Sequence, residues 1–240
     1  MSVNNALARK DPMEQTVTYD AGNEKITLSP STVRNFLVNG NREAVTTQEI
    51  VMFLNLCKFQ HLNPFLREAY LVKYGNDPAT MVVGKDAFAK RAQRNAKYKG
   101  FQAGVIVQKA DGTLENRTGS LVLDGEAIVG GWAKVYVSGY EVPIEASVSY
   151  SEYEGKKFDR ETREYVANRQ WKSKPATMIR KVALVQALRE AFPDDFAGMY
   201  DADEMGIDAA LLNDRPVALP QGEERTDIEE PYPDEFDPLA

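Results

Sequence analysis

Between residues 101 and 150 the sequence alternates strand-like runs with short turns that contain glycine. The runs cover 101–108, 120–123, 127–137 and 142–150, and the turns are Asp111-Gly112, Asp124-Gly125 and Ser138-Gly139. Connections this short join antiparallel neighbours, because parallel strands need a crossover of a dozen or more residues. The pattern therefore predicts an antiparallel β-meander.

Helical spacing appears on both sides of this region. A helix is predicted over 29–39, where Gly40 ends it, and a second helix follows the capping box 46–49. Strands are predicted at 66–74 and 80–84, and a helix at 85–99. We therefore expect an α+β fold, an antiparallel β-meander with packed helices.

A fourth helix is predicted after Trp171, with Ser173 as its cap and Pro175 in its first turn. At 100° per residue one apolar stripe contains Met178, Val182, Val185, Leu188 and Phe192. Arg189 falls inside this stripe, so its guanidinium is expected to need an anionic partner.

Two blocks of sequence carry a family resemblance. The pattern W-x-S-x-P-x-x-M-[IL]-R-x-x-A-x-x-Q-x-x-R-x-A-F, then F-A-G-[MI]-Y-D-x-D-E, is met over 171–204. Leu-Asn-Pro-Phe at 62–65, Glu68, Tyr70, Val-Val-Gly at 82–84 and Asp86 form the second block. Together they resemble the phage Bet family of single-strand annealing proteins, typified by lambda Red beta, within the Bet/RecT superfamily. The resemblance covers roughly residues 45 to 205.

The resemblance implies ATP-independent annealing of complementary DNA strands by an oligomer during phage recombination. It implies single-stranded DNA and the annealed duplex as ligands, and further copies of the chain, in a ring or filament, as partners. A phage 5′–3′ exonuclease or a host single-strand binding protein is a further expected partner. The chain departs from the family after Pro175, where Ala176 and Thr177 replace two basic residues.

Charge is distributed unevenly along the chain. Residues 201–240 hold 13 acids against two arginines, whereas residues 1–200 hold 27 basic and 23 acidic residues. A mildly basic body with an acidic tail is typical of a nucleic-acid binder, although the tail could equally serve only solubility. We expect a flexible N-terminal segment at 1–28, an annealing domain at 29–206 and a disordered acidic tail at 207–240.

Cellular location follows from what the sequence lacks. It has no run of 18 apolar residues and no apolar signal region, and its single cysteine, Cys57, lies on the apolar face of a predicted helix. We therefore predict a soluble protein of the bacterial host cytoplasm, encoded by a phage or prophage, with Cys57 in the core.

Cationic side chains are the candidate DNA contacts. Lys90, Arg94 and Lys97 fall on one side of the predicted helix 85–99, where they either follow a phosphate backbone or are merely solvated. Trp171 either stacks on a base or fills the core. Arg180 and Arg189 contact DNA or form buried ion pairs. The predicted DNA-binding residues are Arg67, Lys85, Lys90, Arg94, Lys97, Trp171, Lys172, Lys174, Arg180, Lys181 and Arg189.

Three of these candidates have a specific rationale. The charge of Arg67 matches a lysine in relatives, which implies a DNA contact, and the alternative is an ion pair with Glu68 or Asp86. Lys172 and Lys174 lie at the predicted helix N-terminus, where free amides favour phosphate.

The sequence offers little for catalysis. The single histidine, His61, argues against histidine triads and histidine metal sites, and no G-x-x-x-x-G-K-[ST] motif is present. No catalytic residue, metal or cofactor is predicted. One alternative is a metal-dependent nuclease built on Glu154 and Lys156 with Asp124 or Glu141, and another is a passive single-strand coating protein.

Overall fold

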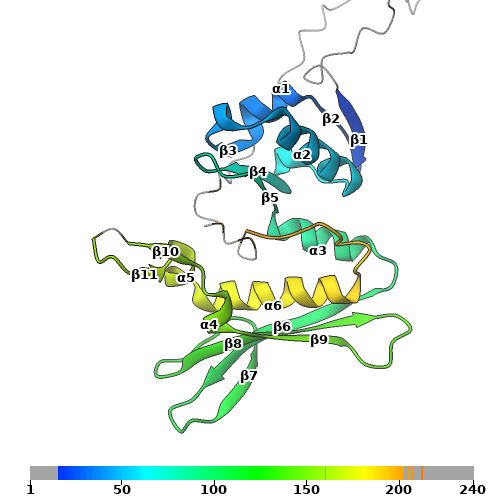
Figure 1. Ribbon diagram of the computed structural model, residues 1–240. Coiled ribbons are helices and arrows are strands. Elements are labelled where there is room, and N and C mark those ends of the chain that lie inside the picture. The colour runs from blue at the N-terminus through cyan, green and yellow to red at the C-terminus, as the bar shows by residue number, and fades with distance from the viewer. Residues whose placement is uncertain (1–15, 160, 203–204, 206, 208–211, 213–240) are drawn as a thin grey trace, which may run out of the picture.

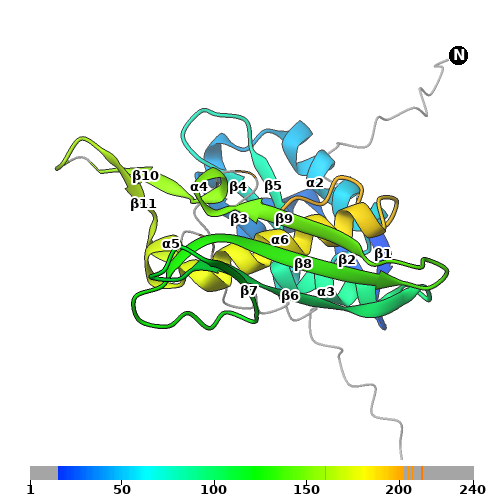
Figure 2. The same cartoon turned by 90° about the horizontal axis from the view of Figure 1, so that it is seen from below.

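The computed structural model describes residues 16–159, 161–202, 205, 207 and 212. It has an α+β fold, which confirms the predicted class. Helices α3 and α6 lie between a four-stranded antiparallel sheet and an N-terminal layer of short strands and helices (Figure 1). In the orthogonal view the sheet covers α6 along its length (Figure 2).

The elements follow one another in the order β1 (Val17–Ala21), β2 (Glu24–Leu28), α1 (Pro30–Thr32), η2 (Val33–Leu37), β3 (Val38–Gly40), η3 (Arg42–Ala44), α2 (Thr47–Phe59), η4 (Pro64–Leu66), β4 (Ala69–Lys73), β5 (Thr80–Val83) and α3 (Lys85–Arg94). The second half contains β6 (Tyr98–Gln108), β7 (Leu114–Thr118), β8 (Ala127–Val137), β9 (Ile144–Ser149), α4 (Tyr150–Tyr153), β10 (Lys156–Phe158), β11 (Tyr165–Ala167), α5 (Arg169–Ser173) and α6 (Pro175–Ala191).

The large sheet has the strand order β7-β6-β8-β9, with every pair antiparallel. Strands β6, β8 and β9 confirm three of the predicted runs, but the strand predicted at 120–123 is wrong. Instead, a turn at Gly112 sends the chain straight back as β7, where Arg117 pairs with Val105. Because β8 takes the other edge of β6, the sheet is not a simple meander.

Helix α6 packs its apolar stripe against this sheet. Met178, Val182, Val185 and Leu188 are all buried, as predicted. The helix lies directly on β8, where a Cβ on Gly131 would come within 2.5 Å of the Ile179 carbonyl oxygen.

The start of this region differs from the prediction. Ser173 does not cap α6 but ends the short helix α5, whose own N-cap is Asn168. The chain turns sharply at Lys174, and α6 starts at Pro175 with no side-chain cap.

The N-terminal layer surrounds α2. The predicted capping box is present, with Thr46 and Glu49 bonding each other's backbone. Cys57 is buried, as predicted, and burial raises the pKa of its thiol. Strands β4 and β5 pair as an antiparallel hairpin.

Two expectations for this layer are wrong. Residues 17–28, expected to be irregular, form the β1–β2 hairpin, which contributes Ile26 and Leu28 to the core. The helix predicted to reach residue 39 ends at Leu37, and β3 follows, parallel to β4.

Helix α3 is shorter than predicted. It ends at Arg94 because Asn95 adopts an extended conformation, and the Asn95 side chain bonds the Lys97 amide and the Asp195 carboxylate. Lys97 therefore does not lie on the helix, and the predicted three-residue ridge is interrupted.

Other features fall in the last third of the chain. The β10–β11 hairpin projects from the body (Figure 1, Figure 2). Most of the predicted acidic tail, residues 207–240, lies outside the described residues. No helix in the described part of the chain is long and apolar enough to cross a membrane.

Candidate nucleic-acid interface

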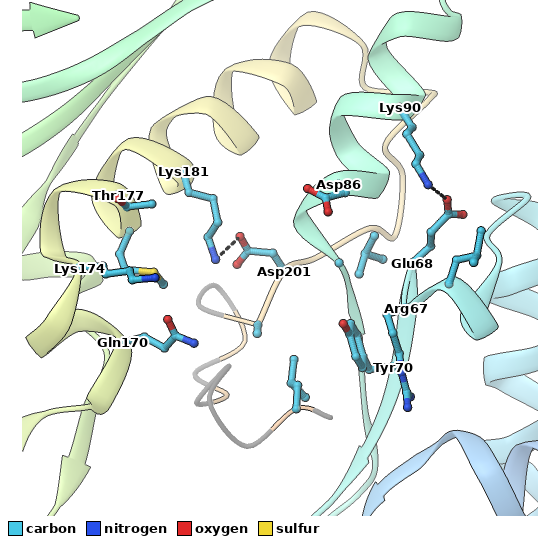
Figure 3. Close-up of a pocket in the computed structure, with 16 residues that line it drawn as sticks. Arg67, Glu68, Tyr70, Asp86, Lys90, Gln170, Lys174, Thr177, Lys181 and Asp201 are labelled. Carbon is cyan, nitrogen blue, oxygen red and sulfur yellow. Dashed lines mark hydrogen bonds and ion pairs between the residues drawn. The ribbon is translucent and has the colours of Figure 1, made fainter. Parts of the chain in front are cut away.

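A cleft of about 630 Å³ opens between two parts of the chain that are far apart in sequence. One wall comes from η4, β4, β5 and α3, and the other from α5, α6 and the segment after α6 (Figure 3). The polar residues that line it are Arg67, Glu68, Asp86, Lys90, Gln170, Lys174, Thr177, Lys181 and Asp201. Both blocks of the sequence pattern therefore meet in one place.

The Asn63–Glu68 turn builds the first wall. The Asn63 side chain accepts bonds from the amides of Phe65 and Leu66, which fixes the short helix η4. The buried Glu68 carboxylate accepts the Asn63 amide at 2.8 Å. Gly84 comes so close that an added Cβ would lie 2.4 Å from the Arg67 carbonyl oxygen, so the start of α3 rests directly on this turn.

This turn and α3 present two cations to the cleft. Arg67 has a left-handed backbone (φ 62°), and its guanidinium lies 6.0 Å from the ring centre of Tyr70. Lys90 donates to Glu68 at 2.6 Å while its side chain remains 46% exposed (Figure 3). Glu68, one of the two acids considered as a partner of Arg67, pairs with Lys90.

The opposite wall presents Lys174 and Lys181. Lys174 is exposed where α5 meets α6. Lys181 is 3.3 Å from the buried Asp201 carboxylate, which follows α6 in the chain (Figure 3). Each wall therefore holds one cation paired with a buried carboxylate.

The first turns of two helices also line the cleft. Gly84 is the N-cap of α3 and Lys174 is the N-cap of α6, and neither residue makes a side-chain cap hydrogen bond. Amides in a first helical turn lack intrahelical acceptors and carry the positive end of the helix dipole. Two such ends beside four cations give the cleft donors suited to oxygen anions, and successive phosphates are ligands of this kind.

Carboxylates moderate this positive character. The cleft contains Glu68, Asp86 and Asp201 against its four cations, and two of these acids are the partners of Lys90 and Lys181. At Lys90 and Lys181 a binding anion must therefore compete with an existing ion pair. Binding of an anion to this cleft should accordingly be moderate and sensitive to salt.

The structure brings Arg67, Lys90, Lys174 and Lys181 together in the cleft, and it places most of the other candidates elsewhere. Only the backbone of Lys85 is described, at the first position of α3. Arg94 lines a separate pocket beside Gly22 and His61. Lys97 and Lys172 are exposed outside the cleft lining.

Arg180 and Arg189 have partners within the protein. The Arg180 guanidinium donates to the Ala103 carbonyl oxygen of β6 at 3.2 Å. Arg189 lies 4.8 Å from the ring centre of Tyr200, so an aromatic ring stacks on its guanidinium. Arg189 lies about 22 Å along the helix from Lys174, at 1.5 Å per residue, and lines a different pocket.

Trp171 takes the second of the two roles considered for it. Its side chain is 1% exposed and meets the Tyr150 ring edge-on, with the ring centres 5.5 Å apart. A base could not reach this ring without rearrangement of the core. Trp171 instead anchors α5, which carries Gln170 into the cleft lining.

Gln170, Thr177 and Tyr70 line the cleft but were absent from the predicted DNA-binding set. Tyr70 belongs to the second family block, and the other two flank the Trp-x-Ser-x-Pro pattern. Tyr70 and Thr177 lie within the two family blocks, which was the available signal, and Gln170 directly precedes the block that starts at Trp171.

The residues of the nuclease alternative make other contacts. Glu154 pairs with Lys156 at 3.5 Å and accepts a bond from Tyr150 at 3.4 Å. Among the residues described, no group of three or more histidines, cysteines or acids could hold a metal ion.

Comparison with known proteins gives the family. The RecT family model matches residues 23–218, which include both walls of the cleft. An uncharacterized protein of Ureaplasma parvum serovar 3 is 27% identical over 168 residues, which cover 68% of this chain and 65% of that protein. The chain thus spans somewhat less than two thirds of that relative's length. Since the family match covers most of the chain, this protein belongs to the RecT family.

Proposed function

We propose that this protein binds single-stranded DNA in the cleft and anneals complementary strands without hydrolysing ATP. The observation that carries the proposal is the convergence of four cations and two uncapped helix N-termini on one cleft. Membership of the RecT family supports it, because proteins of this family are single-strand annealing proteins of recombination.

The mechanism requires positioning only. Phosphates bind to Lys174, Arg67 and the helix ends, so one backbone is held while bases face outward. A complementary strand then pairs with these bases. No bond breaks, and annealing needs no general acid, base or metal.

Several copies of the chain act together in this proposal. A cleft whose cations are partly neutralised binds a strand weakly, but clefts arranged side by side in a ring or filament raise the total affinity by linkage. We propose this arrangement in the bacterial host cytoplasm. A phage exonuclease or a host single-strand binding protein is the proposed partner that delivers the single strands.

The decisive experiment is annealing of two complementary oligonucleotides, one carrying a fluorophore and the other a quencher. Annealing should be accelerated without ATP and should persist in EDTA. A protein that protects single strands but slows their pairing would be a passive coating protein. Degradation of labelled DNA in Mg²⁺ would favour the nuclease alternative.

A matched pair of substitutions tests the cleft itself. Lys174 lines the cleft, whereas the exposed Lys172 does not and carries the same charge two residues away. Lys174→Ala should weaken binding to all sequences alike and reduce the slope of log affinity against log salt by about 0.7. Lys172→Ala should change the affinity and the salt dependence much less. Equal effects of the two variants would contradict the assignment of the cleft.

A further inference from the structure

We propose that the acidic stretch 213–240 of this chain competes with DNA for the cleft. This inference rests on the proposed function, because it takes the cleft to be the DNA site. The stretch holds nine acids against two arginines, a net charge of −7 that equals the formal charge of the whole chain. The acids are Asp214, Glu223, Glu224, Asp227, Glu229, Glu230, Asp234, Glu235 and Asp237.

The stretch begins beside the cleft. Ala202 and Leu212 both line it, and Leu212 packs with Ile207 against the apolar cluster that includes Tyr70 and Val82. The last described residue is therefore attached to the wall that carries Arg67. The acids that follow start within the neighbourhood of the cations that DNA would use.

A carboxylate that precedes this stretch already pairs with a cleft cation. Asp201 follows α6 and places its buried carboxylate 3.3 Å from Lys181, one of the four cleft cations. Lys174 lies on the same wall, and within the described residues no acid pairs with it. The cleft therefore has at least one cation available to the carboxylates of the stretch 213–240.

Chain length allows the contact. Glu223 is 11 residues beyond Leu212, and a chain of that length spans at most about 36–40 Å when extended. A tethered segment has an effective concentration of about a millimolar, so weak carboxylate–lysine contacts suffice to occupy the site. Salt screens such contacts over about 10 Å at 0.1 M, and the competition should fade as salt rises.

The test uses the full chain with all nine acids changed to the corresponding amides. This variant should bind a labelled single-stranded oligonucleotide about tenfold more tightly than wild type at about 50 mM salt, and the difference should narrow by about 200 mM. A matched control keeps every charge and changes Tyr232, Phe236 and Leu239 to Ala. It should bind like wild type.

Two further measurements locate the effect. The gain in DNA affinity from neutralising the acids should be smaller in a Lys90→Ala, Lys174→Ala background, because the acids and the DNA would both bind those cations. Without DNA, acylation of Lys174, measured by mass spectrometry, should be slower in wild type than in the neutralised chain. The same acylation rate in both, or an undiminished gain in the double-alanine background, would overturn the proposal.

The outcomes separate this inference from the proposed function. Equal affinity of wild type and neutralised chain at both salt concentrations overturns the competition but leaves DNA binding intact. A tighter complex produced by the Tyr232, Phe236 and Leu239 control also overturns it, because the segment would then act through apolar contacts. If none of these proteins binds single-stranded DNA, the proposed function itself fails.

Discussion

Replacing Glu68 by Gln should weaken the fold and strengthen DNA binding at the same time. The buried carboxylate accepts Lys90 at 2.6 Å and the Asn63 amide at 2.8 Å, whereas a Gln side chain has one acceptor oxygen for the two donors. The loss of one charge-assisted bond costs about 1.5–3 kcal/mol. For a domain of this size the melting temperature should fall by roughly 3–12 °C.

The same change frees the charge of Lys90, whose side chain is 46% exposed at the cleft. A phosphate would no longer compete with the Glu68 carboxylate for Lys90. The slope of log DNA affinity against log salt should therefore steepen by up to about 0.7, and the affinity for single-stranded DNA should rise a few-fold. Thermal denaturation and fluorescence anisotropy across a salt series measure the two effects.

Glu49→Gln supplies the control for this experiment. Glu49 also pairs with a lysine, Lys73, at 2.8 Å, but that pair is not part of the cleft lining. The Glu49→Gln substitution should lower stability and leave DNA binding unchanged. A Glu68→Gln protein with weaker DNA binding, or with the wild-type salt slope, would refute the reasoning.

Three other predictions concern single residues. Burial disfavours the Glu49 carboxylate, but hydrogen bonds from Lys73 and backbone amides outweigh it and lower its pKa to about 2. Glu49→Gln should lower the free energy of unfolding by about 1–2 kcal/mol after solvent screening. Urea titrations should show the whole of this loss above pH 4.5 and none of it as the pH falls toward 2. A difference in unfolding free energy that does not change with pH would contradict this. Gly84→Ala should lower the melting temperature and weaken DNA binding together, since its Cβ would displace the Arg67 carbonyl; a wild-type melting curve would count against the close approach. Arg189→Ala should cost about 1 kcal/mol of stability with little change in DNA affinity, whereas lost annealing with unchanged melting would support a DNA contact.

Features encoded by neighbouring residues were predictable from the sequence. The capping box of α2 and the buried stripe of α6 depend on spacings of three and four residues, and both are present. The strand predicted at 127–137 has the same bounds in β8. Such patterns need no knowledge of distant parts of the chain.

Features that depend on distant contacts were missed. Helix α3 ends at Arg94 partly because Asn95 bonds Asp195, which is 100 residues away in the chain. Within the site, the charges of Arg67, Lys90, Lys174 and Lys181 could be predicted, but their convergence could not. Charge and spacing do not show which cations share a cleft, because packing of α6 beside α3 decides it.

The segment after α6 ties the two walls of the cleft together. The Val83 amide of β5 donates to the Tyr200 carbonyl oxygen at 2.7 Å, and the next residue, Asp201, reaches Lys181 on α6. These two contacts from adjacent residues form a clasp across the opening. If both contacts broke, the two walls could separate without either wall unfolding. The width of the cleft and the conformational order of the segment after α6 should therefore change together. The Val83 amide is therefore a natural reporter, and its hydrogen exchange should become faster when a bound phosphate takes Lys181 from Asp201 and opens the clasp.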